Sequence, residues 1–512
     1  RISIAFTPPA MLSPAEFSAL AALGYTRIPL VQETAADLET PLSIYLKLCG
    51  QNSAHSFLLE SVHGGERFGR YSFIGLPARQ WLAASGFGAD ARTRFYQDGV
   101  QVDEKTGNPL DVIAAEMERH KVYLPDGMPR FCGGLAGYFG YDTVRHIERK
   151  LEKTCPPDTL GNPDIMLLQC DALAVIDNLK GRLQLIVWAH TQEADAYAKA
   201  QARLTDIQMQ LQQAAQLPPL VSDGQATPIT REFAKTDFLQ SALRAKELIA
   251  AGDFMQVQVG QRMHLPFAHA PIHLYRALRQ LNPSPYMYYY DMGDFQIVGT
   301  SPEILVRQEA CEYQGEAAQK ITIRPLAGTR PRAATPAEDL AREAELLADP
   351  KERAEHVMLI DLARNDIGRI ARTGSVQVTE AFVVERYSHV MHIVSNVEGV
   401  LNPNMSNMDV LRASFPAGTL TGAPKVHAME LIDQLEPSKR GIYGGACGYI
   451  SYGGDMDVAI AIRTGLVKNG QLFVQAAAGI VADSVPELEW QETEAKSRAL
   501  TRAAEMVEMG LL

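Results

Sequence analysis

The stretch FMQVQVGQRMHL, at residues 254–265, decides the fold. Met255 and Val257 alternate with Gln256 and Gln258, which is the period of a β-strand with one apolar face. Successive side chains of a strand point to opposite faces, so Gln256 faces away from the apolar side. The stretch therefore predicts an amphipathic strand.

The elements around this strand are mixed. A helical pattern before it ends at Gly252, and a helix opened by Pro271 follows it. A Tyr-rich strand, a turn at DMGD and the strand FQIVGTSPEILVR (295–307) come next. Because strands and helices do not alternate strictly, we predict an α+β fold with large, mostly antiparallel sheets rather than a doubly wound parallel sheet.

A loss of periodicity divides the chain. Residues 196–216 carry apolar side chains at helical spacing, and LPPLVSDGQATPIT (217–230) does not continue it. We place a linker there, between an N-terminal region, 1–225, and a C-terminal region, 226–512. The N-terminal region has the pattern of mixed strands and turns and need not fold independently, so we expect the two regions to be interwoven in space.

The composition limits the classes of function. Hydrophobic residues make up 46% and charged residues 21% of the 512 residues, so the chain should fold compactly. The net charge of −12 argues against nucleic-acid binding. No stretch reaches the roughly 18 apolar residues of a membrane span. The 6 cysteines lack C-x-x-C spacing, so we expect them to be reduced thiols. Prolines interrupt the apolar N-terminal run, which is not that of a signal peptide, so we expect the protein in the cytoplasm.

Two pairs of glutamates share one spacing. KERAEH and LEWQETEAKS each place two glutamates three residues apart, Glu352 with Glu355 and Glu489 with Glu492. Residues three apart on a helix share a face, so two such helices facing each other would gather all these carboxylates. Oxygen ligands of this kind suit Mg²⁺ bound to an anionic substrate. The same spacing is more often that of solvated salt bridges, and both interpretations stay open on the residues alone.

Two glycine-containing stretches are candidate anion sites. PAGTLTGAPKVHAMELID places Thr419 just before a helical pattern, where free amides bind anions, but it lacks the G-K-[ST] ending of a phosphate loop. QAAAGIV offers amides from a tight turn at Gly479, or is a plain buried strand.

Four single residues stand in contexts that suggest chemistry. Arg463 is a cation in an otherwise apolar strand and needs an anionic partner, either substrate or a structural carboxylate. His392 has apolar neighbours, which is more typical of a core histidine. Glu303, at a bend after TSP, is a general acid or a turn cap. Tyr443 either contacts a ligand or simply packs against neighbouring side chains.

The order of the motifs carries a family resemblance. PSPYMYYY, VGTSPEILVR, IRPLAGTRPR, KERAEHVMLIDLARNDIGR, VMHIVSNV, PAGTLTGAPKVHAMELID, AIAIRTGL and ELEWQETEAK occur in this order, after LLESVHGGERFGRYSFIG. From about residue 24 to 505 the chain resembles the chorismate-utilising enzyme family, and within it the branch that makes anthranilate for tryptophan biosynthesis. The resemblance implies that family's fold, a central sandwich of antiparallel sheets with helices outside.

The resemblance also implies a reaction. Mg²⁺ bridges the protein to the ring carboxylate of chorismate, with Glu355 and Glu492 as the closest ligands and Glu352 and Glu489 supporting through water. Glu303 matches the general acid that protonates the departing C4 hydroxyl. Ammonia adds at C2, and loss of pyruvate then gives anthranilate.

Matching positions supply the rest of the site. His392 matches a histidine near the reacting ring, as a proton shuttle or a positioning group. The residues that hold chorismate are Gly328, Thr329, Thr419, Tyr443, Arg463, the amides of Ala477, Ala478 and Gly479, and Lys496.

Two positions discriminate within the family. Relatives that add water carry a lysine base where this chain has Gln256, so glutamine favours amination. Aminodeoxychorismate synthases, which are the nearest alternative, typically carry a nucleophilic lysine where this chain has Ala327. Alanine cannot form that covalent bond, and direct amination by ammonia is expected.

A feedback site for L-tryptophan is implied by matches in both regions: Glu60, Ser61, Pro285, Tyr286 and Met287. The stretch LLES alone is also consistent with a plain strand and turn. The chain departs from the family at QVQVG, where Q-V-V-P-S is usual, and at Ala477, where a glycine is frequent and a positive φ would be costly.

The resemblance also predicts a partner. The chain has no G-x-C-x-G elbow of a glutaminase, so a separate glutaminase subunit that supplies ammonia is implied, and with it a hetero-oligomer. Two readings of other classes remain as alternatives: a non-catalytic module that senses tryptophan, and a nucleotide-binding protein that uses GTLTGAPK.

Overall fold

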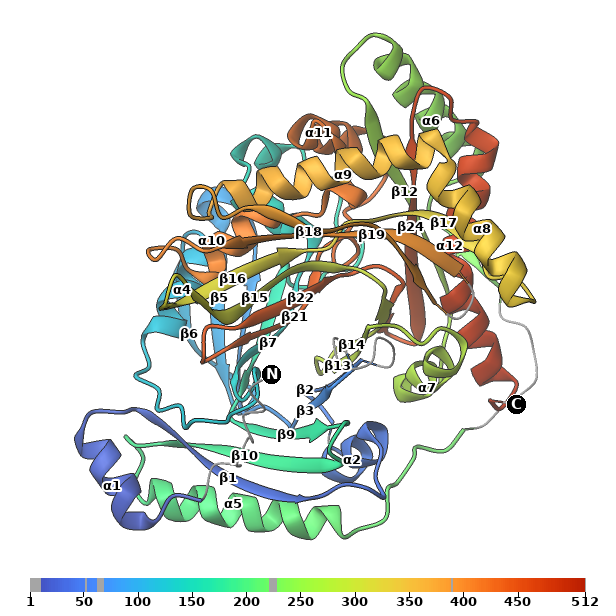
Figure 1. Ribbon diagram of the computed structural model, residues 1–512. Helices are drawn as coiled ribbons and strands as arrows, with labels where there is room; N and C mark the ends of the chain where they lie inside the picture. The colour runs from blue at the N-terminus through green and yellow to red at the C-terminus, as the bar shows by residue number, and fades with distance from the viewer. Residues whose placement is uncertain (1–10, 51–52, 62–68, 221–227, 388–389, 512) are drawn as a thin grey trace.

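The computed structural model of the protein describes residues 11–50, 53–61, 69–220, 228–387 and 390–511 (Figure 1). Within these ranges the strands form two 12-stranded sheets, in which neighbouring strands pair antiparallel. The predicted α+β fold with mostly antiparallel sheets is confirmed. Residues 221–227 of the expected linker and 62–68 of the motif LLESVHGGERFGRYSFIG lie outside the described ranges.

Sheet A begins at β1 and ends at β11. Its spatial order is β1 (Arg27–Ala35), β10 (Arg182–His190), β9 (Ala172–Asp177), β3 (Tyr71–Gly75), β2 (Ser56–Glu60), β13 (Tyr286–Asp291), β14 (Phe295–Ser301), β23 (Thr464–Lys468), β24 (Gln471–Ile480), β12 (Gln256–Pro266) and β11 (Thr230–Arg231), with β20 (Gly422–Ala423) on β12.

Sheet B begins at β17 and ends at β6. Its spatial order is β17 (Leu326–Pro331), β19 (Val390–Val400), β16 (Glu316–Ile323), β15 (Ile304–Tyr313), β22 (Met456–Ile460), β21 (Ala446–Ser451), β7 (Gly134–Phe139), β8 (Ile165–Cys170), β4 (Gln80–Ser85), β5 (Arg92–Gln97) and β6 (Val100–Thr106), with β18 (Gln377–Arg386) on β19.

Helices cover the outer faces of the sheets, with α5 below β1 and β10 and α9 above β18 and β19 in Figure 1. The described helices are α1 (Pro14–Ala22), α2 (Pro41–Leu48), α4 (Pro109–Glu118), α5 (Ala196–Leu211), α6 (Lys235–Ala250), α7 (Pro271–Leu281), α8 (Pro336–Ala348), α9 (Pro350–Gly368), α10 (Asn407–Ser414), α11 (Lys425–Leu435) and α12 (Pro486–Glu508). In the described part of the chain, each helix is too short or too polar to cross a bilayer.

Apolar side chains form separate cores on the two faces of each sheet. One core joins sheet A to α2, α5, α7 and α12, and another joins sheet B to α4, α9, α10 and α11. A third lies between the sheets, where Tyr288 of sheet A packs near Tyr138 of sheet B. Strands from residues 1–225 and 226–512 pair within both sheets, as in β2 with β13 and β7 with β21.

The strand that opens the sequence argument is β12. Val257 and Val259 pack against α6 and α11, as the alternation predicts. Met255 precedes the strand and is 64% exposed, so it does not belong to the apolar face. Gln256 and Gln258 are both buried, because their side of β12 faces the interior of the molecule.

The strand expected from FQIVGTSPEILVR is wrong as a single element. It is split into β14 in sheet A and β15 in sheet B, and Pro302 and Glu303 lie at the crossing. Arg463 likewise lies in a bend between β22 of sheet B and β23 of sheet A, not in a strand. Hydrophobic periodicity in the sequence indicates which residues are extended, but not which of the two sheets they join.

Candidate active site

The two crossings between the sheets lie side by side and position Glu303 and Arg463. The amide of Ile460 donates to the carbonyl of Glu303 at 3.0 Å, and the amide of Thr300 donates to the carbonyl of Arg463 at 3.0 Å. Arg463 has a φ of +50°, a left-handed conformation that is strained for a residue other than glycine. Backbone strain of this kind clusters at functional sites.

The Glu303 carboxyl is buried between the sheets. It is 8% exposed, and Thr419 Oγ1, in the 3₁₀ turn Gly418–Leu420, donates to Glu303 Oε1 at 3.3 Å. Burial raises the pKa of Glu303 to about 8, so the carboxyl keeps its proton at neutral pH. A buried, protonated carboxyl is suited to donate a proton to a leaving group.

His392 is buried and neutral. Burial lowers its pKa to about 4. Its Nδ1 lies 2.9 Å from the carbonyl oxygen of Gly328 and 3.1 Å from Thr329 Oγ1. Because a carbonyl only accepts, Nδ1 carries the hydrogen, and Nε2 presents a lone pair.

Gly328 makes this arrangement possible. Its φ is +67°, at a bulge in the pairing of β17 with β19, and a Cβ at this position would come within 3.2 Å of Glu352 Oε2. A larger residue would both strain the backbone and crowd that carboxylate.

The predicted amides lie on β24 rather than in a turn. Of the two interpretations left open for QAAAGIV, the buried strand is confirmed and the tight turn at Gly479 is wrong, because β24 is extended through Ile480. Neither Gly479 nor Ala477 has a positive φ, so alanine at 477 is not strained. The Gly479 position is instead narrow, because a Cβ there would lie 2.8 Å from Gln256 Nε2 and 2.9 Å from Gln258 Nε2.

The three amides do not face the same way. Lys496 Nζ donates to the carbonyl of Ala477 at 2.9 Å, and the Tyr443 hydroxyl hydrogen bonds to the backbone of Ala477. The backbone N–H and C=O groups of Ala477 and Gly479 therefore point away from β12, toward the side of β23. Because β23 pairs with β24 only as far as Val474, it does not cover these groups. The N–H of Ala478 points to β12.

The two glutamate pairs lie on α9 and α12, as their spacing predicts. Burial is the largest cause of the raised pKa of Glu355. The nearby carboxylates of Glu352 and Glu492 raise it further. Burial raises the pKa of Glu489, and Glu492 again adds to the rise. Carboxylates from both helices are therefore close enough to repel one another.

Two of these carboxylates have cationic partners. Arg330 Nη1 lies 3.3 Å from Glu352 Oε1, and Lys496 Nζ lies 2.7 Å from Glu492 Oε1. Across the described ranges, no group of three or more His, Cys, Asp or Glu side chains is arranged to hold a metal ion. The donor chemistry suits a hard divalent cation, but a closed ligand set would require some of these side chains to move.

Arg463 and Tyr443 connect the crossings to α12. Burial lowers the pKa of the Arg463 guanidinium, which the nearby Tyr443 and Glu492 partly oppose. The site thus contains a partly buried cation near Tyr443 and Glu492. An anionic ligand would compensate its charge.

All five residues predicted for regulation line one cavity between the sheets, together with Arg307 and Tyr449. Glu60 on β2 pairs directly with Met287 on β13, and its carboxylate is ion paired with Arg279 at 3.1 Å. Arg307 Nη2 donates to the Tyr286 hydroxyl at 3.0 Å.

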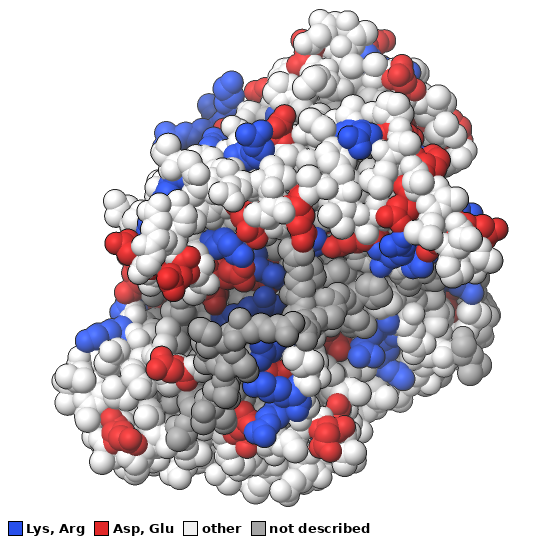
Figure 2. Space-filling model, viewed as in Figure 1, with Lys and Arg blue, Asp and Glu red and all other residues white. Residues whose placement is uncertain are grey.

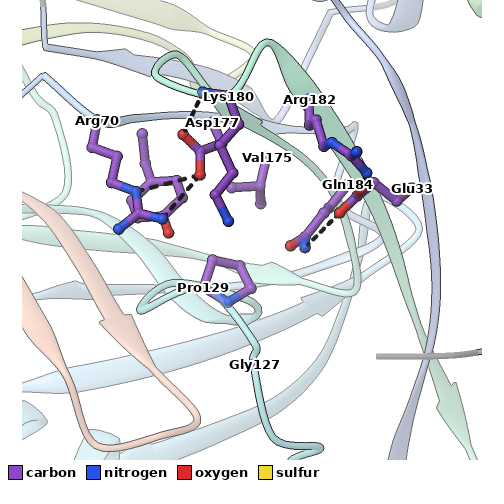
Figure 3. A pocket seen from close by; sticks show the side chains of 10 residues that line it. Glu33, Arg70, Gly127, Pro129, Val175, Asp177, Lys180, Arg182 and Gln184 are labelled. Carbon is purple, nitrogen blue, oxygen red and sulfur yellow. Dashed lines mark hydrogen bonds and ion pairs between the residues drawn. The ribbon is translucent and has the colours of Figure 1, made fainter. Parts of the chain in front are cut away.

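A further cavity, of about 420 Å³, lies on β1, β9 and β10 (Figure 3). Two of its cations are paired with carboxylates: Arg70 is 3.1 Å from Asp177, and Arg182 is ion paired with Glu33. None of the predicted site residues lines it. The face seen in Figure 2 is hollowed below α9, and Lys and Arg side chains gather there.

Comparison with known proteins decides the family. The family model described as chorismate binding enzyme matches residues 69–502. The chain belongs to the chorismate binding enzyme family. It is 56% identical over 504 residues to the protein named anthranilate synthase component 1 of Neisseria meningitidis serogroup A, which covers 98% of this chain and 100% of that protein. The protein of the same name from Aquifex aeolicus is 45% identical and covers 94% of this chain and 96% of its own length.

Solved structures of family members agree with the fold. Anthranilate synthase component I of Streptococcus pneumoniae matches with a TM-score of 0.72 and 36% identity over 92% of this chain and 99% of that one. The menaquinone-specific isochorismate synthase of Escherichia coli, at 20% identity and a TM-score of 0.70 over 96% and 98% of the two chains, shares the fold.

Sequence reasoning missed a buried ion pair beside these chorismate binding enzyme motifs. Arg440 Nη2 lies 2.6 Å from Glu436 Oε1, and Arg440 Nη1 donates to the carbonyl of Leu420 at 2.7 Å. Glu436 also accepts from the amide of Gly260 at 2.7 Å. Through these contacts the ion pair connects the turn that contains Thr419 with β12. Its signal was an arginine and a glutamate four residues apart in LEPSKR, which is too common to single out.

Proposed function

We propose that the protein aminates chorismate with ammonia and eliminates pyruvate, which gives anthranilate. The observation that carries this proposal is identity of 45% to 56%, over nearly the whole chain, to proteins named anthranilate synthase component 1. The buried, protonated Glu303 and the buried, neutral His392 support the chemistry.

In this reaction Glu303 gives its proton to the departing C4 hydroxyl, which would otherwise leave as hydroxide. Thr419 orients the carboxyl through its hydrogen bond. His392, with a lone pair on Nε2, accepts a proton or fixes the ring by a hydrogen bond. Both groups are uncharged at neutral pH, so an anionic substrate does not have to enter against a buried carboxylate.

Cations and backbone donors hold the carboxylates of chorismate. Arg463 and Lys496 are the charged groups of the site, and the N–H of Gly479 and the Tyr443 hydroxyl add directional contacts. Charge-assisted hydrogen bonds of this kind fix both position and orientation.

Glu355, Glu492, Glu352 and Glu489 would hold Mg²⁺ between α9 and α12. The oxygen donors suit that ion, and the mutual repulsion that raises the pKa of Glu355 is relieved by a divalent cation. When bound, Mg²⁺ supplies a positive charge that draws electrons from the ring.

Two side chains favour direct amination. Gln256 has no basic group, and Ala327 has no nucleophile. An aminodeoxychorismate synthase that lacks its lysine is the second candidate, and only the product distinguishes the two. A separate glutaminase component supplies ammonia in the assembled enzyme, and L-tryptophan binds the cavity lined by Glu60, Ser61 and Met287 as an inhibitor.

The direct test mixes the purified protein with chorismate, Mg²⁺ and an ammonium salt. We expect fluorescent anthranilate and pyruvate in equal amounts. An aminated ring that keeps its enolpyruvyl group would favour the second candidate. Tryptophan binding without turnover would identify a non-catalytic sensor, and stabilisation by ATP would identify a nucleotide-binding protein.

A further inference from the structure

A large cavity lies near the end of sheet B that is farthest from the candidate active site. β17 and β19, which carry Thr329 and His392, begin that sheet, whereas the cavity lies on β4, β5 and β8 near its other end. The start of β1 and the ends of β10 and α4 close its other side. Its volume is about 620 Å³, which is in the range of sites that hold small organic molecules.

Arg27, the first residue of β1, places a buried positive charge on this cavity. The residue is only 7% exposed, and among the described residues its Nε has no hydrogen-bond partner. Its Nη1 donates to the carbonyl of Thr26 at 3.2 Å, and the hydroxyl of Tyr452 also contacts the guanidinium. Both of these partners are uncharged. A buried guanidinium normally requires an anionic partner, because its charge has lost the solvation of water.

His120 does not supply the missing partner. Its Nε2 lies 3.5 Å from Arg27 Nη2 and 3.7 Å from Glu116 Oε1. One ring nitrogen cannot donate to the carboxylate and accept from the guanidinium at the same time. The hydrogen bond from His120 is the largest cause of the lowered pKa of Glu116, which assigns the nitrogen to Glu116. Arg27 Nε and Nη2, the two atoms of one edge of the guanidinium, therefore remain available to a ligand.

The carboxylates around the cavity are already paired with other groups. Arg119 Nη1 lies 3.5 Å from Glu116 Oε1, and His190 Nε2 lies 3.1 Å from Asp171 Oδ1. Two adjacent nitrogens on one edge of a guanidinium match the two oxygens of a carboxylate, which they bind with parallel hydrogen bonds. The structure thus provides a carboxylate-binding group without its carboxylate.

The remaining walls select among carboxylates. Leu82 and Phe95 are directly opposed on β4 and β5 and supply an apolar surface, and the stacked rings of Trp81 and Tyr96 also line the cavity. Rings of this kind favour a flat, aromatic ligand. A ligand with several negative charges is disfavoured, because further carboxylates also line the cavity, those of Asp103, Glu116 and Glu193.

We propose that this cavity is a second ligand site, in which Arg27 binds an aromatic monocarboxylate. The carboxylate accepts from Nε and Nη2, and the ring of the ligand packs on Leu82 and Phe95. Gln80 and Gln97 are directly opposed on the same face and offer their amides to polar substituents of the ring. The inference does not depend on the proposed function, because the site lies away from the residues assigned to chorismate.

The test measures the Kd of benzoate for the full chain by saturation-transfer NMR. Excess chorismate and Mg²⁺, without ammonia, keep benzoate out of the candidate active site. Arg27→Met removes the charge at nearly the same length and should raise the Kd at least about ten-fold, the effect of losing charge-assisted hydrogen bonds. Arg244→Met makes the same change on the exposed part of α6, where Arg244 is ion paired with Glu247, and should leave the Kd unchanged.

Benzamide provides a comparison that does not need a folded variant. It has the shape of benzoate without the charge, so its Kd for the unmodified protein should be at least about ten-fold higher. Crystals soaked in 4-bromobenzoate should show the anomalous signal of bromine in the cavity, with the carboxylate at Arg27. Equal Kd values for benzoate and benzamide would overturn the inference, and so would an unchanged Kd in Arg27→Met. Absence of benzoate binding, or bromine only at other sites, would overturn it as well.

Discussion

Glu303 and His392 owe opposite pKa shifts to one cause. Burial disfavours the charged form of either group, so it raises the pKa of the carboxyl to about 8 and lowers that of the imidazole to about 4. At neutral pH the site therefore contains one proton to give and one lone pair to receive a proton. Groups with pKa values pushed apart in this way mark acid and base roles.

The dependence of the rate on pH follows from the carboxyl. Glu303 is protonated below its raised pKa and loses the proton above it, so its donor function is present below about pH 8 and is lost as the pH rises through that value. We expect kcat/KM for chorismate, at a fixed concentration of uncharged ammonia, to fall about ten-fold per pH unit on the alkaline side. A profile that stays level well above that pH would contradict the assignment.

Glu303→Gln tests the same proton by removing it. Glutamine has nearly the same shape and keeps an oxygen for Thr419, but it cannot transfer a proton. Turnover should decrease by about 10²–10⁴-fold. The KM for chorismate and the thermal unfolding midpoint should stay close to those of the unmodified protein. A variant with more than a tenth of the original kcat would assign the proton to another group.

At the scale of elements, α9 and α12 carry the acidic residues to one place from segments far apart in the sequence. Arg330 on β17 contacts both Asp349, which caps α9, and Glu352. Lys496 likewise forms an ion pair with Glu492, and both residues are on α12. Each cation pairs with a carboxylate of one of the two helices, and a divalent cation would compete with it for the same oxygens.

Glu355→Gln and Glu492→Gln test this arrangement, each by removing one charged oxygen. Binding of Mg²⁺, measured by calorimetry with the purified protein, should weaken at least about ten-fold, and turnover should be nearly abolished. Glu487→Gln is the matched control, because Glu487 is also on α12 but is ion paired with Lys235. Unchanged Mg²⁺ binding in either test variant would remove that residue from the ligand set.

The elements differ in how far the sequence determines them. The alternation in 256–266 and the glutamate spacing on α9 and α12 are local, so the sequence alone predicts both. The break at Pro302, the bend at Arg463 and the extended backbone at Gly479 depend on which sheet each segment joins. That choice is made by tertiary packing. Local patterns and the family resemblance therefore supplied candidate site residues but not their surroundings.

At the scale of the whole molecule, the cavity proposed for tryptophan and the candidate active site share a strand pair. Tyr286, which lines that cavity, pairs directly with Ser301 on β14. The Ser301 hydroxyl donates to the carbonyl of Glu303 at 3.1 Å and accepts from its amide at 3.3 Å. A ligand that moves β13 would therefore move the backbone of Glu303, the proposed general acid, which is a physical route for inhibition.

Ser61→Phe tests that route from the far end. Phenylalanine fills the cavity next to Glu60 and Met287, so tryptophan can no longer enter, while no residue of the chorismate site changes. We expect the rate without tryptophan to stay within about two-fold of the original and the concentration for half inhibition to rise at least about ten-fold, because inhibition requires preferential binding to one state. Ser18→Phe, on exposed α1, is the control for the added ring. If Ser61→Phe were inhibited as strongly as the unmodified protein, tryptophan would bind elsewhere, and the strand pair between Tyr286 and Ser301 would lose its regulatory role.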